Sequence, residues 1–291
     1  MNIVILSRNK DLYSTRRLVE EAEKRNHIVE VIDPLSCDLI IENEKPTILY
    51  KDKYLDYVDA IIPRIGASVT FYGCAVVRQF EMMNVFSSVS SDAIIRSRDK
   101  LRSFQHLSKA GVDMPKTVFT NYSRDVEKVI AQVGGTPVVI KLIKGTQGIG
   151  VVLAESKIAA ESVLEAFNEL EARALIQEYI AEAKGADLRA LIVDEQVVGA
   201  MKRQGKEGEF RSNLHRGGTY EHYKLSDGEI KIAIKAARKL KLPICGVDLL
   251  QSDRGPLVME INSTPGLEGI ESASKKNIAQ AIITYIERNR Y

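Results

Sequence analysis

Short apolar runs alternate with amphipathic stretches along the first part of the chain. Residues 2–6 (NIVIL) predict a strand, residues 14–27 an amphipathic helix and residues 28–33 (IVEVID) a second strand. A further strand is predicted over residues 58–66 and a helix over residues 71–83. This alternation predicts a small open parallel sheet with helices on its faces. No GxGxxG sequence follows the first strand, so a dinucleotide-binding fingerprint is absent.

A second pattern begins near residue 96. A helix is predicted over residues 97–111, because Gly111 can take the positive φ that follows a helix end. Two polar loops interrupt the rest of the chain, one rich in glycine at residues 144–150 and one that reaches to about residue 222. Strands are expected over 136–143, 151–155, 174–180, 187–193, 196–203, 244–252 and 256–262, and helices over 158–170, 227–241 and from 272 onward.

Composition places the chain among ordinary globular proteins. Of its 291 residues, 45% are hydrophobic, which is enough to fill one large core or several small ones. No apolar run reaches the roughly 18 residues of a membrane span, and the first ten residues do not form a signal peptide. Three widely spaced cysteines predict neither a disulfide framework nor a zinc site, and a net charge of +2 gives no case for nucleic-acid binding. We therefore expect a cytoplasmic protein with no membrane partner and no direct nucleic-acid partner.

The last predicted hairpin carries polar residues inside an apolar strand. Alternate side chains of a strand share a face, so Glu260 and Asn262 point the same way. A turn at residues 252–255 (SDRG) would pair this strand with the preceding one and set Asp248 about opposite Glu260. Two carboxylates and an amide oxygen are ligands that suit Mg²⁺ or Mn²⁺. A half-exposed hairpin with its polar face in water explains this segment equally well.

Two lysines indicate an anionic ligand near the glycine-rich loop. Lys141 lies within an apolar strand, where an unpaired ammonium is costly. Gly145, Gly148 and Gly150 let backbone amides approach phosphate oxygens closely. The loop leads to a strand and lacks GK[ST], so it is not a P-loop. Lys100 stands in the first turn of a predicted helix, where a lysine by itself is typical of a solvated surface.

Polar residues at strand ends are further candidates. Glu178 and Tyr179 end one strand, and Asp187 and Arg189 lie two apart on the next, which suits a surface ion pair as well as a ribose or phosphate contact. Arg64 ends a strand of the amino-terminal sheet, where open α/β sheets commonly bind ligands. It could hold a carboxylate of a ligand, cap a neighbouring helix or pair with an acidic surface residue.

The polar segment at residues 204–218 (QGKEGEFRSNLHRGG) has two interpretations. It can be a solvated loop, or a lid whose Arg211 closes over a phosphate with Asn213 beside it. The sequence alone leaves both open.

Several segments in order along the chain resemble the RimK-type glutamate ligases of the ATP-grasp superfamily. They are SRDKLRS, KLIKGTQGIGVVLAE, QEYI, EGEFRSNLHRGG, CGVDLL and GPLVMEINSTPGLEGIE, with IDPLSC and IPRIGASVTFYG in the amino-terminal part. The resemblance implies an ATP-grasp fold, which combines α/β and α+β architecture, with an open parallel α/β domain before it. It divides the chain into an amino-terminal pre-ATP-grasp domain (1–95), a central ATP-grasp subdomain with the glycine-rich loop (96–185) and a carboxy-terminal subdomain with the metal site (186–291).

The resemblance also implies ATP binding between the two subdomains and a role for individual residues. Lys100, Lys141 and the glycine-rich loop would contact phosphates, residues 178–180 the adenine, and Asp187 the ribose. The implied nucleotide-binding set is Lys100, Lys141, Gly145, Gly148, Gly150, Glu178, Tyr179, Ile180, Asp187, Arg211, Ser212 and Asn213. Asp248, Glu260 and Asn262 would hold two Mg²⁺ or Mn²⁺ ions. Loss of charge at Asp248 or Glu260 is then expected to abolish turnover and leave the fold largely intact.

The implied activity is ADP-forming ligation of glutamate to the carboxyl terminus of a small-subunit ribosomal protein, with short polyglutamate chains as further products. An acyl phosphate would activate the acceptor, and Arg203 or Arg211 would stabilise the oxyanion that follows. We expect a homo-oligomer. Two alternatives stay open: a ligase of the same fold for another acceptor, such as an amino-acid carrier protein or a cofactor tail, and a nucleotide-binding regulatory module without turnover.

Overall fold

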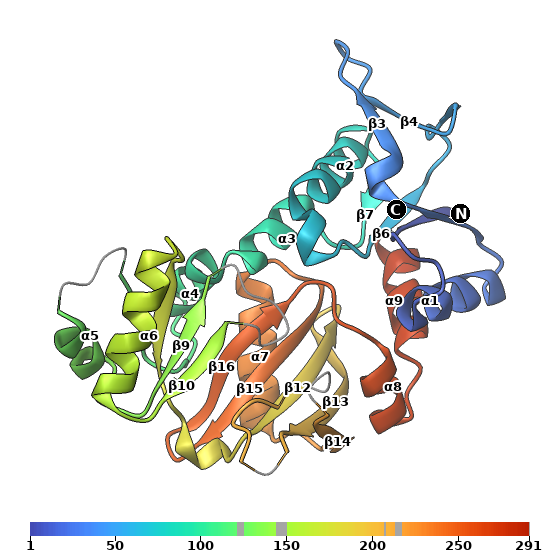
Figure 1. The fold of residues 1–291 in the computed structure, drawn as a ribbon. Coiled ribbons are helices and arrows are strands. Elements are labelled where there is room, and N and C mark those ends of the chain that lie inside the picture. The colour runs from blue at the N-terminus through green and yellow to red at the C-terminus, as the bar shows by residue number, and fades with distance from the viewer. Residues whose placement is uncertain (121–124, 144–149, 207, 213–216, 291) are drawn as a thin grey trace.

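Four sheets organise the part of the chain that the structure describes (Figure 1). The computed structural model describes residues 1–120, 125–143, 150–206, 208–212 and 217–290. None of the helices in these ranges is both long and apolar enough to cross a membrane. Short 3-10 helices occur at η1 (Pro34–Ser36), η2 (Ala67–Val69) and η3 (Ala181–Ala183).

The amino-terminal sheet is parallel and confirms the predicted strand–helix alternation. Its strand order is β2-β1-β6-β7, and the inner strand β1 is buried from Ile3 to Leu6. The strands are β1 (Asn2–Leu6), β2 (Ile28–Ile32), β6 (Ala60–Pro63) and β7 (Phe86–Ser87), and the helices are α1 (Tyr13–Lys24), α2 (Thr70–Met82) and α3 (Ser91–Arg98).

A small antiparallel sheet projects from this domain and was not predicted. It consists of β3 (Cys37–Ile40), β4 (Thr47–Tyr50) and β5 (Lys53–Tyr54). Helix α2 holds it, because the Gln79 side-chain amide donates to the carbonyls of Ile40 (2.9 Å) and Thr47 (3.0 Å). These strands are only two to four residues long, which is too short for a period-2 pattern to be recognised in the sequence.

The central part has an antiparallel sheet with its own apolar core. The strand order is β10-β9-β11-β8, and Val138, Ile140 and Ile176 are fully buried against α6. The elements are α4 (Lys100–Lys109), β8 (Thr117–Phe119), α5 (Val126–Gln132), β9 (Val138–Leu142), β10 (Val151–Ala154), α6 (Lys157–Glu169) and β11 (Ala174–Glu178).

The helix predicted over residues 97–111 is interrupted. Residues 97 and 98 end α3, and Asp99 adopts an extended conformation and caps α4 by accepting from the Arg102 amide at 2.9 Å. An aspartate side chain in this position satisfies a backbone donor that the first helical turn leaves free. Lys100 is consequently the first residue of α4.

The carboxy-terminal sheet is antiparallel and runs in the order β14-β13-β12-β15-β16. Helix α7 packs on it, whereas α8 lies against β13 and β14. The elements are β12 (Ala186–Val193), β13 (Gln196–Gln204), β14 (Thr219–His222), α7 (Asp227–Lys239), β15 (Ile244–Ser252), β16 (Gly255–Asn262), α8 (Glu268–Ser274) and α9 (Ile278–Asn289). Strand β14 lies in the segment that the sequence analysis left as a polar loop.

The single final helix predicted from residue 272 is wrong, because two helices, α8 and α9, replace it. Lys275 ends α8 in the left-handed conformation (φ +55), and Asn277 caps α9 by accepting from the Gln280 amide at 2.9 Å. Neither signal interrupts the apolar periodicity, so the periodicity alone does not show the break.

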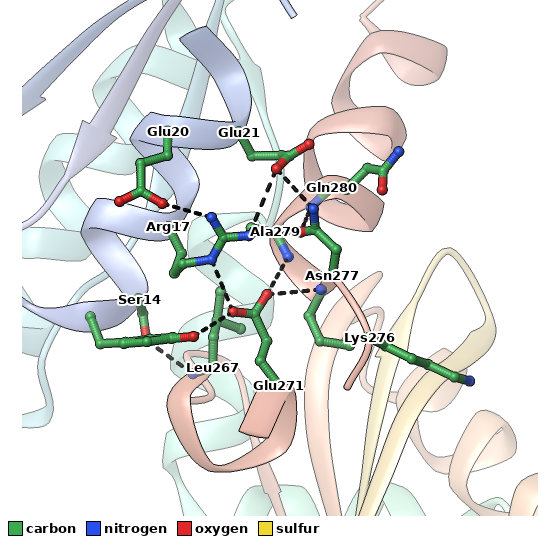
Figure 2. Close-up of polar contacts among 12 residues, drawn as sticks. Ser14, Arg17, Glu20, Glu21, Leu267, Glu271, Lys276, Asn277, Ala279 and Gln280 are labelled. Carbon is green, nitrogen blue, oxygen red and sulfur yellow. Dashed lines mark hydrogen bonds and ion pairs between the residues drawn. The ribbon is translucent and has the colours of Figure 1, made fainter. Parts of the chain in front are cut away.

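Glu271 on α8 joins three elements (Figure 2). Its Oε1 accepts from the amides of Ile278 (2.8 Å) and Ala279 (3.1 Å) at the start of α9, and its Oε2 accepts from Tyr13 (3.0 Å) and Arg17 (3.1 Å) on α1. The carboxylate is buried and its charge complements the amino terminus of α9. Glu271 therefore fixes the amino-terminal domain to the segment that follows β16.

Glu271→Gln should destabilise the protein by about 1–3 kcal/mol, because a buried amide cannot accept all four hydrogen bonds. The matched control is Glu20→Gln: Glu20 also pairs with Arg17 but its side chain is 57% exposed, so we expect a change within about 0.5 kcal/mol. Urea unfolding of the two variants measures both values. Equal midpoints for the two variants would contradict the structural role of Glu271.

Candidate active site

Charged side chains from four strands share one face of the carboxy-terminal sheet. The register places Asp187 opposite Arg203, Arg189 opposite Asp248, and Asp248 opposite Glu260. Residues paired directly across antiparallel strands lie on the same face. The Asp248–Glu260 pairing confirms the register predicted from the sequence. The two partners differ in environment, because Asp248 is 2% exposed and Glu260 is exposed to solvent.

Two arginines and two aspartates form a buried network on this face. Arg189 donates to both Asp248 oxygens at 2.7 Å, and Arg203 donates to Asp248 at 2.8 Å. Arg203 also makes a bidentate contact with Asp187, through Nε at 2.6 Å and through Nη2. Two positive and two negative charges leave the group neutral, which offsets the desolvation of each member. The surface ion pair between Asp187 and Arg189, one of the two sequence interpretations, is therefore wrong.

The network controls the charge of Asp248. Burial would raise the pKa of this carboxyl group, but the positive charges of Arg189 and Arg203 outweigh burial and hold the pKa at about 2. Asp248 is therefore ionised throughout the neutral range. Asp187 has both carboxylate oxygens engaged by Arg203, so a ribose hydroxyl would have to share one of them.

Lys100 and Lys141 face Glu260 from the central part of the chain. Burial lowers the pKa of Lys141 to about 8, and the charge of Glu260 partly opposes this shift. The pKa of Lys100 is also lowered by burial and raised in part by Glu260. Lys141 donates to Gln177 Oε1 at 2.6 Å, and Lys100 donates to the Leu142 carbonyl at 3.0 Å. Two partly desolvated ammonium groups side by side favour a polyanion such as a phosphate chain.

The segment predicted to follow the adenine edge lies where β11 ends. Glu178 is held by Arg254 (Oε1 at 2.7 Å and Oε2 at 2.5 Å) and accepts from the Lys116 amide at 2.9 Å, so its side chain ties β11 to the β15–β16 turn. Ile180 packs with Leu257 in a small buried apolar cluster. Tyr179, which precedes Ile180 in the sequence, is half-buried. An apolar cluster at the end of a strand suits a flat heterocycle.

The remaining predicted nucleotide contacts lie near β10. Gly150 has φ +72, and a Cβ there would lie 2.5 Å from Leu142, so only glycine fits. Arg211 makes a bidentate pair with Glu209 (2.8 and 2.7 Å) and donates to the Val151 carbonyl at 3.2 Å. Ser212 is buried. Gly145, Gly148 and Asn213 lie outside the described residues, as does part of the segment that the lid interpretation concerns.

Gln177 belongs to this site but was not among the predicted site residues, and Arg189 was considered only with Asp187, for an ion pair or for a ribose or phosphate contact. The alternation of β12 puts Arg189 on the same face as Asp187, which was a usable signal, but its partner Asp248 is 59 residues away in the sequence. Gln177 is buried, accepts from Lys141 and donates to Thr117 Oγ1 at 2.8 Å. It therefore orients the ammonium of Lys141, and no sequence pattern shows this.

The predicted metal ligands offer acceptor positions for a divalent cation. Within the described ranges, no group of three His, Cys, Asp or Glu side chains could hold a metal ion. The predicted set instead combines two carboxylates with an amide. The Glu260 side chain makes no hydrogen bond or ion pair with the described residues, and among the same residues Asn262 Oδ1 accepts only from the Thr264 amide (2.9 Å). Asp248 accepts three hydrogen bonds and keeps one acceptor position. This donor set fits Mg²⁺ or Mn²⁺.

The arrangement of the two subdomains around this face is that of an ATP-grasp protein. The structure is similar to that of the ATP-grasp ligase PsnB, solved with a phosphomimetic variant of its minimal precursor, Mg and ADP, with a TM-score of 0.75, 20% identity and 98% of both chains covered. It is also similar to D-alanine–D-alanine ligase from Bacillus anthracis complexed with ATP, with a TM-score of 0.70 and 18% identity over 100% of this chain and 97% of that one. At these identities the likeness establishes the fold.

Sequence comparison then gives the family. Residues 97–286 match the RimK-like ATP-grasp domain and residues 1–94 the RimK PreATP-grasp domain. The probable alpha-L-glutamate ligase of Aliivibrio salmonicida (strain LFI1238) is 61% identical over 289 residues, which cover 99% of this chain and 96% of the relative. A relative of the same name from Marinomonas sp. (strain MWYL1) is 57% identical and covers 100% of this chain and 97% of its own. The chain belongs to the RimK-like ATP-grasp family, as the resemblance predicted, and is an ADP-forming ligase.

The burial of Asp248 changes one expectation about its substitution. Asp248→Asn should destabilise the protein by about 3–5 kcal/mol, because two buried guanidinium groups would then share one carboxylate. Glu260→Gln serves as the control: its side chain is exposed, so its stability should change by no more than about 0.5 kcal/mol. Both variants should lose ligase activity. Denaturant unfolding separates the two effects, and an unchanged midpoint for Asp248→Asn would show that the network contributes little.

The low pKa of Lys141 predicts a pH-dependent affinity for ATP. In the free protein the ammonium loses its proton near pH 8, whereas a bound phosphate raises its pKa. Binding above pH 8 must therefore take up a proton, and Kd should increase by up to about tenfold per pH unit. Calorimetry between pH 7 and 9.5 measures this. Lys141→Arg, which keeps its charge, should remove the dependence, and a wild-type Kd independent of pH would refute this assignment.

Proposed function

We propose that this protein joins the amino group of glutamate to the carboxyl terminus of a small-subunit ribosomal protein, with conversion of ATP to ADP, and can extend the product to short polyglutamate chains. Relatives that are 57–61% identical over nearly the whole chain are named probable alpha-L-glutamate ligases. The observation that carries the proposal is the face on which Lys100 and Lys141 oppose Glu260 beside the arginine–aspartate network. The acceptor, a cytoplasmic setting and a homo-oligomeric state are parts of the same proposal.

The proposed position of ATP follows the distribution of charge and apolar surface. The adenine lies against Ile180 with its edge toward the backbone of residues 178–180, and the ribose lies near Asp187. Lys100, Lys141 and the loop ended by Gly150 contact the phosphates, where the two lysines provide positive charge in a partly desolvated site. Arg211, Ser212 and Asn213 complete the phosphate contacts.

Glu260, Asn262 and the remaining acceptor position of Asp248 would hold the divalent metal, as one or two Mg²⁺ or Mn²⁺ ions. When bound, the metal would offset the negative charge that develops in phosphoryl transfer. The arginines keep Asp248 ionised throughout the neutral range, because they hold its pKa at about 2. Asp248 therefore does not have to lose a proton before a metal binds.

The reaction needs activation because a carboxylate is a poor electrophile. An acceptor carboxylate oxygen attacks the γ-phosphorus of ATP, the bond to the β-phosphate oxygen breaks, and ADP and an acyl phosphate form. The amino group of glutamate then attacks the acyl carbon, and inorganic phosphate leaves with one former carboxylate oxygen. Arg203 and Arg211 are the proposed oxyanion donors. Arg189 is a third, since its side chain is 13% exposed against 7% for Arg203.

Intact-mass spectrometry of acceptors tests this proposal. The protein is incubated with ATP, Mg²⁺, glutamate and a small-subunit ribosomal protein whose chain ends in glutamate, and we expect additions of whole glutamate residues with one ADP for each. Omission of glutamate and the Glu260→Gln variant are the controls. Modification of a carrier protein or a cofactor tail, but not of the ribosomal protein, would show that the proposed acceptor is wrong. Nucleotide binding without turnover on any acceptor would favour a regulatory module.

A further inference from the structure

Three arginines without acidic partners lie where the amino-terminal sheet meets the active-site strand. Arg8 stands in the loop after β1, Arg64 directly after β6, and Arg98 at the end of α3. In the described part of the chain, none of the three forms an ion pair with a carboxylate. Arg64 and Arg98 are partly buried, whereas Arg8 is exposed. Most other partly buried arginines do pair with an acid, as Arg17, Arg189 and Arg203 show. Uncompensated positive charge at a partly buried position is costly unless an anion binds there.

Arg98 connects this group to the proposed reaction centre. It donates to the carbonyls of Ile65 and Gly66 (3.2 Å for Gly66) and to Thr70 at 2.7 Å, and it reaches Thr264 Oγ1 at 3.4 Å. The Thr264 amide in turn donates to Asn262, a proposed metal ligand. Among the described residues Arg98 has only neutral acceptors, so it fixes the β6–α2 loop beside the active site without an acidic partner there.

Arg64 and Arg8 flank the loop that Arg98 holds. The backbone amide of Arg64 continues the sheet by donating to Leu6 O at 2.9 Å, whereas its half-buried guanidinium makes no hydrogen bond to the described residues. Burial lowers the pKa of Arg64 to about 10, so it stays charged at neutral pH. Arg8 is exposed and reaches Ser68 Oγ at 3.4 Å. The sequence interpretations in which Arg64 caps a helix or pairs with an acid find no support in these contacts.

The helices that follow the two loops add positive electrostatic potential to this surface. Neither α1 nor α2 has an acidic residue in its first turn or a side-chain cap at its start, so both helix amino termini keep their partial positive charge. Two large apolar side chains stand exposed at the same helix starts, Leu12 (54%) and Phe71 (89%). Positive charge beside exposed apolar side chains suits an acidic peptide better than a free inorganic anion.

We propose that the β1–α1 and β6–α2 loops bind the acidic carboxy-terminal tail of the acceptor, with Arg64 and Arg8 pairing with its carboxylates. This inference rests on the proposed function, because it identifies the surface along which the tail reaches the acyl-phosphate centre. Arg98 is a positioning residue that holds the β6–α2 loop against Thr264. Repeated glutamate addition would keep presenting carboxylates to the same arginines.

A binding experiment without turnover tests the surface. A fluorescently labelled peptide ending in two glutamates with a free carboxyl terminus is titrated with ATP-free protein, and a peptide ending in two glutamines with an amidated terminus is the neutral control. Arg64→Ala and Arg8→Ala should each weaken binding of the acidic peptide by roughly tenfold or more, since each removes a charge-assisted contact. Arg78→Ala, which removes an exposed, unpaired arginine two turns further along α2, should have no effect. The Kd for ATP should stay unchanged in all three.

The outcomes separate the surface from the activity. Equal peptide affinity in wild type, Arg64→Ala and Arg8→Ala overturns this surface, and so does a wild type that binds the acidic and neutral peptides alike. Arg8 is exposed, so its variant tests the surface even if Arg64→Ala folds poorly. If the peptide binds in an Arg64-dependent way but is never extended by glutamate, the proposed function fails and the acidic-peptide surface stands. If wild type, Arg64→Ala and Arg8→Ala all extend the peptide with the same KM, the proposed function stands and the proposed surface fails.

Discussion

The active-site face depends on one buried group of four charges. Arg189 and Arg203 come from two strands and meet Asp248 on a third, while Asp187 balances Arg203. Removal of any one charge leaves a buried excess, so the group resists partial protonation and partial rearrangement. As a result, two guanidinium groups and one carboxylate have fixed positions before any ligand arrives. Such preorganisation is what electrostatic stabilisation of a transition state requires.

The strand that carries Glu260 connects this network to the rest of the molecule. It pairs with the Asp248 strand on one side and continues through Asn262 and Thr264 into a loop held by the amino-terminal domain. The Leu267 amide donates to Ser14 on α1 at 2.9 Å, and Glu271 lies one turn further on (Figure 2). The amino-terminal domain is thus hydrogen-bonded to the segment that follows the proposed metal ligands. Its loops are well placed to bring an acceptor to that site.

Local pattern was sufficient for much of this fold. Apolar runs gave β1, β2, β9, β12 and β15, and a four-residue turn fixed the Asp248–Glu260 register because strand pairing on either side of a tight turn leaves little freedom. The partner that Arg203 and Arg189 share was not predictable, because Asp248 lies 45 and 59 residues away from them and the contact depends on strand order. Asp187, the other partner of Arg203, lies only 16 residues away across the β12–β13 hairpin. The break at Asp99 and the division between α8 and α9 were missed for a different reason: single residues make them, and the apolar period continues across both.

The central claim is that the site activates a carboxylate as an acyl phosphate. If both oxygens of the acceptor carboxylate carry ¹⁸O, attack on the γ-phosphorus followed by displacement by glutamate must transfer one ¹⁸O to the released inorganic phosphate. Mass spectrometry of the phosphate and nucleotide products after one turnover measures this directly. We predict one ¹⁸O in each phosphate and unlabelled ADP; ¹⁸O in AMP with release of pyrophosphate, or unlabelled phosphate beside ligated product, would contradict the account.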